Sequence, residues 1–326
     1  MTKRQTEQRQ QTDEQTKQRW TTGRIPDQTG RVFVVTGANS GLGLATTREL
    51  ARHGAHVILA VRDLAKGERA VAEITAEQPD ASLEIHRVDL ADLDSVRAFA
   101  GHVRADHRHI DVLINNAGVM APPRSVSEQG HELQFASNHL GHFALTGLLL
   151  DPLTAGRDPR VVTVSSVNHR QGRIHFDDIA GEFAYKPMAF YNQSKLANTV
   201  FGLELHRRLT EAGSPVRSVL AHPGYTATNL QLNGPVGLVR VVFGHVLGPL
   251  FAQPPARGAW SQLYAATEPA VAGGQFIGPD GMGELRGRPK LVEAAPAATD
   301  PGTGRRLWEL SEELTEVRFA FPTPVD

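Results

Sequence analysis

The chain has 326 residues, of which 40% are hydrophobic, so it can bury a substantial core in one large domain or two smaller ones. Its formal net charge of −1 argues against nucleic acid as a partner, because there is no strong basic field. Cysteine is absent, which excludes disulfides, thiolate catalysis and cysteine-ligated zinc or iron–sulfur sites.

The first 22 residues are polar and charged, and we expect them to form a disordered tail because they can bury almost no apolar surface. They lack the hydrophobic centre of a signal peptide, and their three acidic residues disfavour the alternative of a transit peptide. The nearest approach to a membrane span, at 234–252, contains Arg240 and His245. We therefore expect no integral membrane span and a cytoplasmic location.

From residue 31 onward, short β-branched runs alternate with longer amphipathic segments. The predicted strands are Val32–Thr36, His56–Val61, Leu83–Val88, Val112–Asn115, Val161–Ser165 and Val216–Ala221. The predicted helices cover 41–53, 63–77, 92–105, 131–150, 190–212 and, after a surface excursion at 294–306, 305–317. Repeated βα units predict an α/β fold with one doubly wound parallel sheet and helices on both faces. No linker divides residues 23–326, which we expect to form a single domain.

A glycine-rich turn lies between the first predicted strand and the helix that follows it. Glycines there let the backbone approach a pyrophosphate, and the helix N-terminus offers free N–H groups and a partial positive charge. The alternative is an ordinary glycine-rich βα turn. The residues predicted to contact a dinucleotide in this turn are Gly37, Asn39, Ser40, Gly41, Leu42 and Gly43.

The end of the second strand indicates which dinucleotide binds. Val61 stands where an acidic residue usually meets a free 2′-hydroxyl, and Arg62 follows it. Because a guanidinium suits a 2′-phosphate, NADP(H) is favoured and NAD(H) is possible. Asp63 can instead take the acidic role, or form a surface ion pair with Arg62.

The next two strand ends offer further cofactor contacts. Asp89, followed by Leu90, can accept a hydrogen bond from adenine or can cap a helix. Asn116, Ala117 and Gly118 allow close approach to a ribose. For Asn116 and its neighbour Asn115, a structural role that ties adjacent strands together is favoured over direct chemistry.

The sixth strand is followed by His222, Pro223 and Gly224, where the proline and glycine predict a turn beside the nicotinamide. Thr226 and Thr228 can contact the carboxamide or the pyrophosphate. A packed or hydrogen-bonded role is favoured for His222. The other histidines show no metal-ligand spacing, so no metal site is predicted.

Tyr191 and Lys195 share one helix face because they are four residues apart. A free tyrosine has a pKa of about 10, and a nearby ammonium, together with the charge of an oxidised nicotinamide, lowers it. The pair can then transfer a proton near neutral pH. Ser165 and Ser166 end the fifth strand, and only one of them should face the site, because successive side chains alternate.

In these motifs the chain resembles the short-chain dehydrogenase/reductase family, in the branch of retinol dehydrogenases and protochlorophyllide-reductase-like enzymes. The resemblance covers about residues 30–318 and rests on Thr36-Gly-x-x-x-Gly-x-Gly43, Asn115-Asn-Ala-Gly118, Asn138-His-Leu-Gly-His-Phe143, Ser166, Tyr191-x-x-x-Lys195 and Pro223-Gly224. It implies a Rossmann sheet of about seven strands and a catalytic tetrad. The tetrad residues are Asn138, Ser166, Tyr191 and Lys195.

The resemblance also implies what each tetrad residue does. Tyr191 is the acid/base, Ser166 orients the substrate oxygen, Lys195 binds the nicotinamide ribose, and Asn138 holds a relay water. Ser166 and Tyr191 are 25 residues apart, further than in compact members, and we expect the segment between them to border the substrate entrance. Ser40 stands where many NADP-using relatives carry a basic residue. The lack of cysteine argues against a true light-dependent protochlorophyllide reductase.

These features predict an NADP(H)-dependent carbonyl reductase or alcohol dehydrogenase. A Gly-, Pro- and Leu-rich segment at 229–262 suggests a lid over a lipophilic or aromatic substrate, although an irregular connection packed on the core fits equally well. The alternative function is a non-catalytic NADP-binding redox sensor or interaction protein, which would not need Tyr191 with Lys195. The face around 190–212 is either core or the interface of a homodimer.

Overall fold

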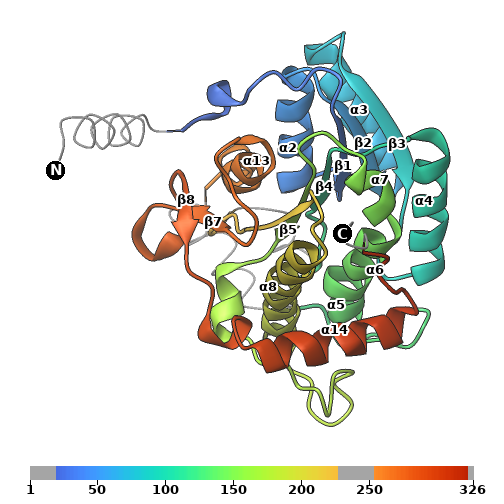
Figure 1. Ribbon diagram of the computed structural model, residues 1–326, viewed down its shortest axis with the longest axis vertical. Helices are drawn as coiled ribbons and strands as arrows, with labels where there is room; N and C mark the ends of the chain where they lie inside the picture. Colours follow the sequence, from blue (N-terminus) through green and yellow to red (C-terminus); the bar gives the residue numbers. More distant parts are fainter. Residues whose placement is uncertain (1–19, 227–252, 322–326) are drawn as a thin grey trace.

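The computed structural model describes residues 20–226 and 253–321, and its centre is an eight-stranded sheet of order β3-β2-β1-β4-β5-β6-β7-β8 (Figure 1). All neighbouring strands pair in parallel except β7 and β8. The strands are β1 (Val32–Thr36), β2 (His56–Val61), β3 (Ser82–Arg87), β4 (Val112–Asn115), β5 (Arg160–Val164), β6 (Arg217–Ala221), β7 (Phe276–Pro279) and β8 (Pro289–Val292).

The order of the strands reverses between β1 and β4. From β1 the chain builds β2 and β3 to one side, and it then returns to place β4 on the other side. In an open parallel sheet the carboxyl ends of the strands leave a crevice at this switch point, and ligands bind there. The loops after β1, β4, β5 and β6 therefore meet on one rim.

Helices cover both faces of the sheet. Figure 1 shows α2, α3 and α13 on one side, and α4, α6 and α8 on the other. The longer helices are α2 (Gly41–Arg52), α3 (Leu64–Glu77), α4 (Leu93–Asp106), α6 (Gly141–Leu148), α8 (Pro187–Glu211), α13 (Trp260–Thr267) and α14 (Pro301–Thr315). The short ones are η1 (Thr22–Arg24), α5 (Leu133–Phe135), η2 (Ala136–Leu140), α7 (Leu150–Thr154), η3 (Val167–Gln171), α12 (Pro255–Gly258), η5 (Met282–Glu284) and η6 (Pro296–Ala298).

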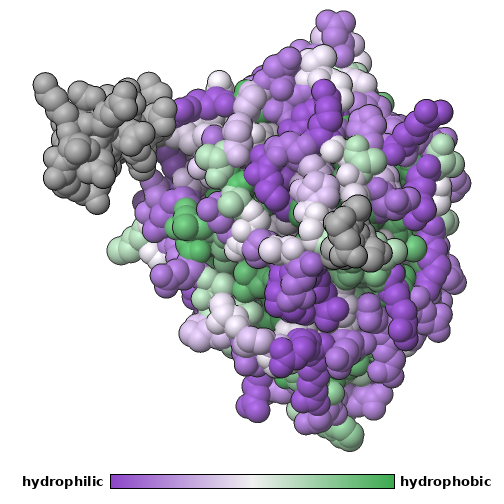
Figure 2. All heavy atoms as spheres, in the orientation of Figure 1, coloured by the Kyte–Doolittle hydropathy of each residue, from purple (hydrophilic) through white to green (hydrophobic). Residues whose placement is uncertain are grey.

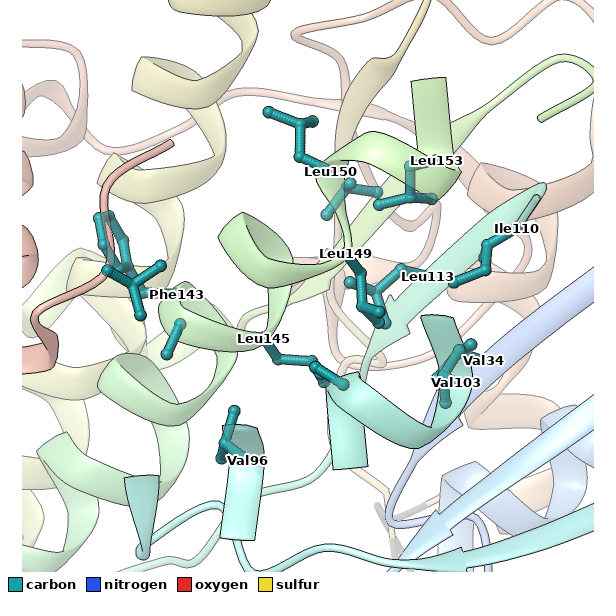
Figure 3. Packing of buried hydrophobic residues seen from close by; sticks show 14 of the residues in the cluster. Val34, Val96, Val103, Ile110, Leu113, Phe143, Leu145, Leu149, Leu150 and Leu153 are labelled. Atoms are coloured by element: carbon teal, nitrogen blue, oxygen red, sulfur yellow. The ribbon is translucent and has the colours of Figure 1, made fainter. Parts of the chain in front are cut away.

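Hydrophobic side chains are concentrated inside the fold. Figure 2 shows a mainly hydrophilic outer face. Inside, Val34 of β1 and Leu113 of β4 are fully buried (Figure 3). They belong to one cluster with Leu145 of α6, Leu153 of α7 and Leu149, which lies between these two helices. Each fully buried side chain of this kind contributes roughly 1.5–3 kcal/mol. Because the central strands are buried on both faces, their continuous apolar runs fix the sheet between its two helix layers.

Most predicted bounds lie within a few residues of the observed ones, but two predicted segments, 131–150 and 294–306, differ clearly from the structure. The helix predicted over 131–150 is divided into α5, the π-helical turn η2 and α6. The predicted excursion at 294–306 is shorter, because Asp300 caps α14 by accepting a hydrogen bond from the Thr303 N–H at 2.7 Å, so that the helix begins at Pro301. With the antiparallel edge strand β8 the sheet has eight strands, close to the expected number of about seven.

The predicted tail reaches residue 22, but the described structure begins with packed residues. The Trp20 ring is 6% exposed and makes edge contacts with Trp260 and Tyr264 of α13. Burial of a large indole offsets the polar character of its neighbours, so Trp20 belongs to the packed fold and not to the predicted tail. Within residues 20–226 and 253–321, no helix is long and apolar enough to cross a membrane.

The predicted helix over 190–212 corresponds to α8, and its apolar face belongs to the core. Phe201 and Leu205 pack in the main cluster together with Trp308 of α14, which crosses α8 (Figure 1). The residues of α8 around Tyr191 are also buried. Of the two interpretations of this face, the structure supports core packing.

Candidate active site

The glycine turn joins the end of β1 to the start of α2, at the point where the strand order reverses. Gly37 has a φ of +66°, and a Cβ at Gly43 would lie 2.2 Å from the Gly37 backbone oxygen. Side chains at either position would be strained or would clash. Ser40 is the N-cap of α2, yet its side chain makes no capping hydrogen bond. The first N–H groups of α2 therefore have no side-chain cap, which suits a phosphate ligand.

The end of β2 carries the residues predicted to select the cofactor ribose. Asp63 is the N-cap of α3, where its Oδ1 accepts a hydrogen bond from the Lys66 N–H at 3.0 Å. Its other carboxylate oxygen lies 3.6 Å from Lys66 Nζ. Asp63 is thus engaged with Lys66 and not with Arg62. Arg62 is exposed one residue beyond the strand, where a phosphate can reach it.

Asp89 and Leu90 lie in the loop after β3. Asp89 Oδ1 accepts a hydrogen bond from the Ala91 N–H at 3.0 Å, whereas the cap of α4 is Asp92. Asp89 therefore shapes the loop and leaves the helix cap to another residue. A Cβ at Gly141 would lie 2.2 Å from the Leu90 backbone oxygen, so this loop lies directly on α6. The contact between Asp89 and adenine remains a prediction.

The amides of Asn115 and Asn116 have structural roles, as the sequence favoured. Asn115 Nδ2 donates to Thr146 Oγ1 of α6 at 2.9 Å. Asn116 Nδ2 donates to the Thr36 backbone oxygen at 2.8 Å, which joins the end of β4 to the end of β1. Thr36 Oγ1 also accepts hydrogen bonds from the N–H groups of Asn116 and Ala117, at 2.9 and 3.0 Å. These bonds hold the loop after β4 beside the glycine turn.

Asn138 lies in the π-helical turn η2 and is fully buried. Its Oδ1 accepts from the Val119 N–H at 2.7 Å, and its Nδ2 donates to the Val119 oxygen and to Ser194 Oγ, both at 2.9 Å. The amide therefore clamps the loop after β4 to α8. Because both amide hydrogens are used, a relay water would have to bind another atom of Asn138. The water-binding role remains a prediction.

The two serines that end β5 point in opposite directions. Ser165 Oγ donates to the Lys195 backbone oxygen at 2.9 Å, inside the fold. Ser166 Oγ accepts from the Asn168 N–H at 3.2 Å, and the serine is close enough to the Tyr191 phenol to act to lower its pKa. Ser166 is therefore the serine that shares the site with Tyr191, as the alternation along the strand requires.

Tyr191 and Lys195 lie one turn apart on α8, and both are buried. Lys195 Nζ donates to the Val164 backbone oxygen at 3.2 Å and lies 5.9 Å from the centre of the Tyr191 ring. A Cβ on Gly118 would lie 3.6 Å from the same Nζ atom, so the loop after β4 also borders the ammonium. The ammonium has further donor hydrogens for a ribose hydroxyl.

Burial moves the pKa values of these two groups in opposite directions. It raises the pKa of Tyr191 to about 12, against the effect of the hydrogen bond with Ser166, and it lowers the pKa of Lys195 to about 8. For Tyr191 the loss of hydration is the largest effect, and the lower pKa expected beside an oxidised nicotinamide remains a prediction. Tyr191 is therefore protonated at neutral pH and can donate a proton.

The turn after β6 is held by backbone contacts and by a hydrogen bond between His222 and Glu284. His222 is buried, with Nε2 at 2.9 Å from Glu284 Oε2, and its Nδ1 accepts from the Gly224 N–H at 3.2 Å. The hydrogen-bonded role favoured for His222 is thus the one that the structure has. Thr226 Oγ1 donates to the Pro223 oxygen at 3.1 Å, which closes the turn on the rim.

The predicted lid at 229–262 is described only from Gln253 onward; Thr228 and residues 229–252 lie outside the described residues. Gln253 forms a parallel β-bridge with Thr226, and its N–H donates to the Tyr225 oxygen at 2.9 Å. A Cβ at Gly258 of α12 would lie 2.8 Å from Leu42 Cδ2. The described part of this segment, from Gln253 onward, therefore begins at the cofactor rim.

The segment between Ser166 and Tyr191 is anchored to the loop after β4. The Tyr185 hydroxyl lies 3.1 Å from the Pro122 oxygen and 3.2 Å from Glu132 Oε1, and it accepts from Gln134 Nε2 at 2.9 Å. The Arg306 guanidinium of α14 lies 4.1 Å from the centre of the Phe176 ring. The position of this segment at a substrate entrance remains a prediction.

Sequence reasoning missed three residues that organise the site. Thr36 receives the hydrogen bonds of the β4 loop, and Ser194 receives one from Asn138. Gln262 Nε2 lies 3.2 Å from Asn116 Oδ1, which ties α13 to the same loop. Ser194 shares the Tyr191 motif and could have been noticed from it. The partners of Thr36 and Gln262 depend on contacts across the fold, which no spacing along the chain reveals.

The residues present fit a nicotinamide dinucleotide. A helix without a side-chain cap, glycines that approach closely, and an exposed arginine follow the first two strands. A phenol, a hydroxyl and an ammonium lie together at the end of β5 and on α8. This second group can bind the oxygen of an alcohol or carbonyl and move a proton to or from it.

Comparison of the sequence with known proteins finds dehydrogenases. A sequence model described as short chain dehydrogenase matches residues 31–234. Retinol dehydrogenase 14 from Mus musculus is 39% identical over 298 residues, which cover 88% of this chain and 86% of that protein. Polyprenol dehydrogenase from Mus musculus is 40% identical over 297 residues, which cover 89% of this chain and 85% of that protein.

A solved structure is similar over almost the whole chain. It is the crystal structure of an uncharacterized protein from Mycobacterium paratuberculosis, which is 44% identical to this chain. The two superpose with a TM-score of 0.77, and the match covers 94% of this chain and 100% of the other.

Proposed function

This chain belongs to the short-chain dehydrogenase family, oxidoreductases that act on CH–OH and C=O groups with NAD(P), and we propose that it transfers a hydride between NADP(H) and a lipophilic alcohol or carbonyl compound. The observation that carries the proposal is the grouping of Ser166, Tyr191 and Lys195 on the rim that the glycine turn also borders. A protein that only binds a dinucleotide has no need of this proton-transfer group.

In this proposal each side chain has a separate task. The bound nicotinamide supplies or accepts the hydride. Ser166 donates a hydrogen bond that orients the substrate oxygen, and Tyr191 gives its proton to that oxygen in the direction of reduction. Lys195 binds the cofactor ribose with its remaining hydrogens, and its charge stabilises the phenolate that forms. Asn138 acts by holding the loop after β4 in position.

Preference for NADP(H) rests on Arg62. Its guanidinium lies beyond the end of β2, and its acidic neighbour Asp63 is occupied as the cap of α3. The capping contact of Asp63 directs one of its two carboxylate oxygens toward α3. A guanidinium can make charge-assisted hydrogen bonds with a 2′-phosphate.

The lipophilic substrate class rests on two observations. The relatives at 39–40% identity are named retinol dehydrogenase and polyprenol dehydrogenase, after long apolar alcohols. The 229–262 segment is rich in Gly, Pro and Leu, and its described end lies beside the turn after β6. We propose that this segment covers the apolar part of the substrate.

The first test replaces Tyr191 by phenylalanine. We expect Tyr191→Phe to lower kcat for aldehydes about 100- to 10,000-fold, the usual contribution of a positioned acid, with NADPH affinity retained. NADPH oxidation is followed with aldehydes and ketones graded by size and polarity, including retinal. Tyr264→Phe is the matched control, because Tyr264 packs on Trp20 of the N-terminal segment. Equal turnover by Tyr191→Phe and the unchanged protein would contradict the proposed acid.

The second test concerns the cofactor. Arg62→Ala should raise the Kd of NADPH about 10- to 100-fold, because a charged hydrogen bond contributes about 1.5–3 kcal/mol. The Kd of NADH should change little, since NADH lacks the phosphate. Fluorescence titration measures both, and Arg69→Ala, an exposed arginine of α3, is the control. An equal loss for both cofactors would remove the basis for NADP preference.

A further inference from the structure

Outside the active site, a cluster of histidines and carboxylates lies at the β3 edge of the sheet. Along β3 the side chains alternate: Leu83 and Ile85 pack with the cluster on the α2 side, so Glu84 faces α4. His56 begins β2, and His107 directly follows α4. Three segments that are distant in the sequence thus bring one carboxylate and two imidazoles together, which explains why spacing along the chain gave no sign of a metal site.

The ligand atoms of these three residues converge. His107 Nε2 lies 2.9 Å from Glu84 Oε2, and His56 Nε2 lies 3.2 Å from the same oxygen. All three atoms lie within 4.8 Å of one another. In a tetrahedral zinc site with bonds of roughly 2.0–2.1 Å, neighbouring ligand atoms are about 3.3 Å apart. Small side-chain rotations would therefore place all three around one ion.

A further contact orients the imidazole of His56. His56 pairs with Ser82 across β2 and β3, and its Nδ1 lies 2.8 Å from Ser82 Oγ. When the hydroxyl accepts the Nδ1 hydrogen, Nε2 presents its lone pair to the cluster, as metal-binding histidines do. A lone pair that faces a carboxylate oxygen is stable only with a cation between them, either a proton or a metal ion.

The surroundings are partly shielded from water. The exposed fractions of the side chains are 27% for His56, 27% for Glu84 and 16% for His107. Oε2 of Glu84 lies against both imidazoles. His86 lies against its other oxygen, Oε1, on the side away from His56 and His107.

We propose that His56, Glu84 and His107 bind one Zn²⁺ ion, with water in the fourth position, and that the ion joins β2, β3 and the end of α4. Two imidazoles and one carboxylate suit zinc, whereas Mg²⁺ and Ca²⁺ prefer oxygen ligands alone. The ion would stabilise the outer edge of the sheet. β3 has one pairing neighbour, β2, among the described strands, so its other edge is not secured by a ladder.

The test uses the full-length protein without a histidine tag, freed of metal with a chelator. Calorimetric titration with ZnCl₂ should give one equivalent bound, and MgCl₂ should give none. At about a hundredfold excess of Zn²⁺ over Kd, the Tm should rise by about 4 °C. His107→Gln and His56→Gln should each weaken Zn²⁺ binding at least about tenfold. His109→Gln, two residues from His107 and 41% exposed, should leave it unchanged.

Ser82→Ala adds a variant that removes no ligand. It should weaken Zn²⁺ binding about 10- to 100-fold, as loss of a group that orients a ligand does, while the fold is retained by circular dichroism. Zn²⁺ binding that is absent, or equal in His56→Gln, His107→Gln and the unchanged protein, would overturn the proposal and leave the cluster as a proton-linked ion pair. Because the readout is metal binding, the result does not depend on whether the proposed oxidoreductase activity is correct.

Discussion

At the scale of single residues, one physical cause gives Tyr191 and Lys195 complementary properties. Burial disfavours the charged form of each, so the phenol keeps its proton and the ammonium loses its proton more readily than in water. Reduction of a carbonyl needs both groups protonated. The range that meets this condition ends where Lys195 titrates, because Tyr191 remains protonated far above neutral pH.

This predicts the pH dependence of carbonyl reduction. The pKa of Lys195 is about 8, below its ordinary value, so the ammonium is present below that pH and is lost as the pH rises through it. We expect kcat/KM for NADPH to be level between pH 6 and 7 and to fall above about 8, since this parameter reports the free enzyme. Lys195→Arg, which stays charged, should remove the fall. A profile that stays level to pH 9.5 would contradict this role for Lys195.

At the scale of elements, the turn between β1 and α2 depends on close backbone approach. A Cβ at Gly43 would lie 2.2 Å from the Gly37 oxygen and 2.8 Å from Asn116 Nδ2. Asn116 in turn holds the end of β4 against Thr36. A side chain at Gly43 would therefore separate two strand ends as well as fill the space of a phosphate.

We expect Gly43→Ala to weaken NADPH binding at least about 100-fold and to lower the free energy of unfolding by about 1–3 kcal/mol, because backbone must shift to admit the methyl group. The control is Gly101→Ala in α4, where a Cβ meets nothing within 4 Å. That change should raise the free energy of unfolding by roughly 0.5–1 kcal/mol through helix propensity. Fluorescence titration and urea unfolding measure the two effects. Unchanged NADPH affinity in Gly43→Ala would contradict the phosphate role of the turn.

The length and composition of each strand explain which strands the sequence predicts. Val32–Thr36 and Val112–Asn115 are continuous apolar runs, and the structure has them with the predicted bounds. Phe276–Pro279 and Pro289–Val292 were not predicted, because each has only four residues and contains proline. Their pairing comes from tertiary contacts at the edge of the sheet. The π-helical turn at Ala136–Leu140 likewise leaves no mark in the apolar pattern, which reads as one helix.

In the site, what lies close along the chain was predictable. Tyr191 and Lys195 share a face by their spacing, and the choice of Ser166 over Ser165 follows from its place in the motif. Asn138 was identified only through family resemblance, because its partners Val119 and Ser194 come from other elements. The raised pKa of Tyr191 also could not be predicted, since burial is a property of the assembled fold.

At the scale of the whole molecule, the C-terminal segment locks the α8 side of the fold. Helix α14 crosses α8, as Figure 1 shows, and brings Trp308 into an aromatic cluster. The Trp308 ring lies 5.0 Å from that of Phe143 in α6 and 4.6 Å from that of Phe319 near the end of the described chain. The Arg208 guanidinium of α8 lies 4.4 Å from the centre of the Trp308 ring. One side chain thus joins α6, α8 and the C-terminal segment.

Trp308→Ala should therefore lower the free energy of unfolding by about 3–5 kcal/mol, because it removes a large buried ring and leaves a cavity. Trp308→Phe should cost clearly less, since it keeps an aromatic ring and removes an indole Nε1 that has no hydrogen-bond partner among the described residues. Urea unfolding of the two variants measures the difference.

NADPH affinity of the folded variants should stay within about twofold of the unchanged protein, because the cluster lies on α6, α8 and α14 while the phosphate turn lies at the start of α2. Equal stability of the two variants would mean that the C-terminal segment does not hold the core together, and that its position beside α8 follows from the fold without reinforcing it.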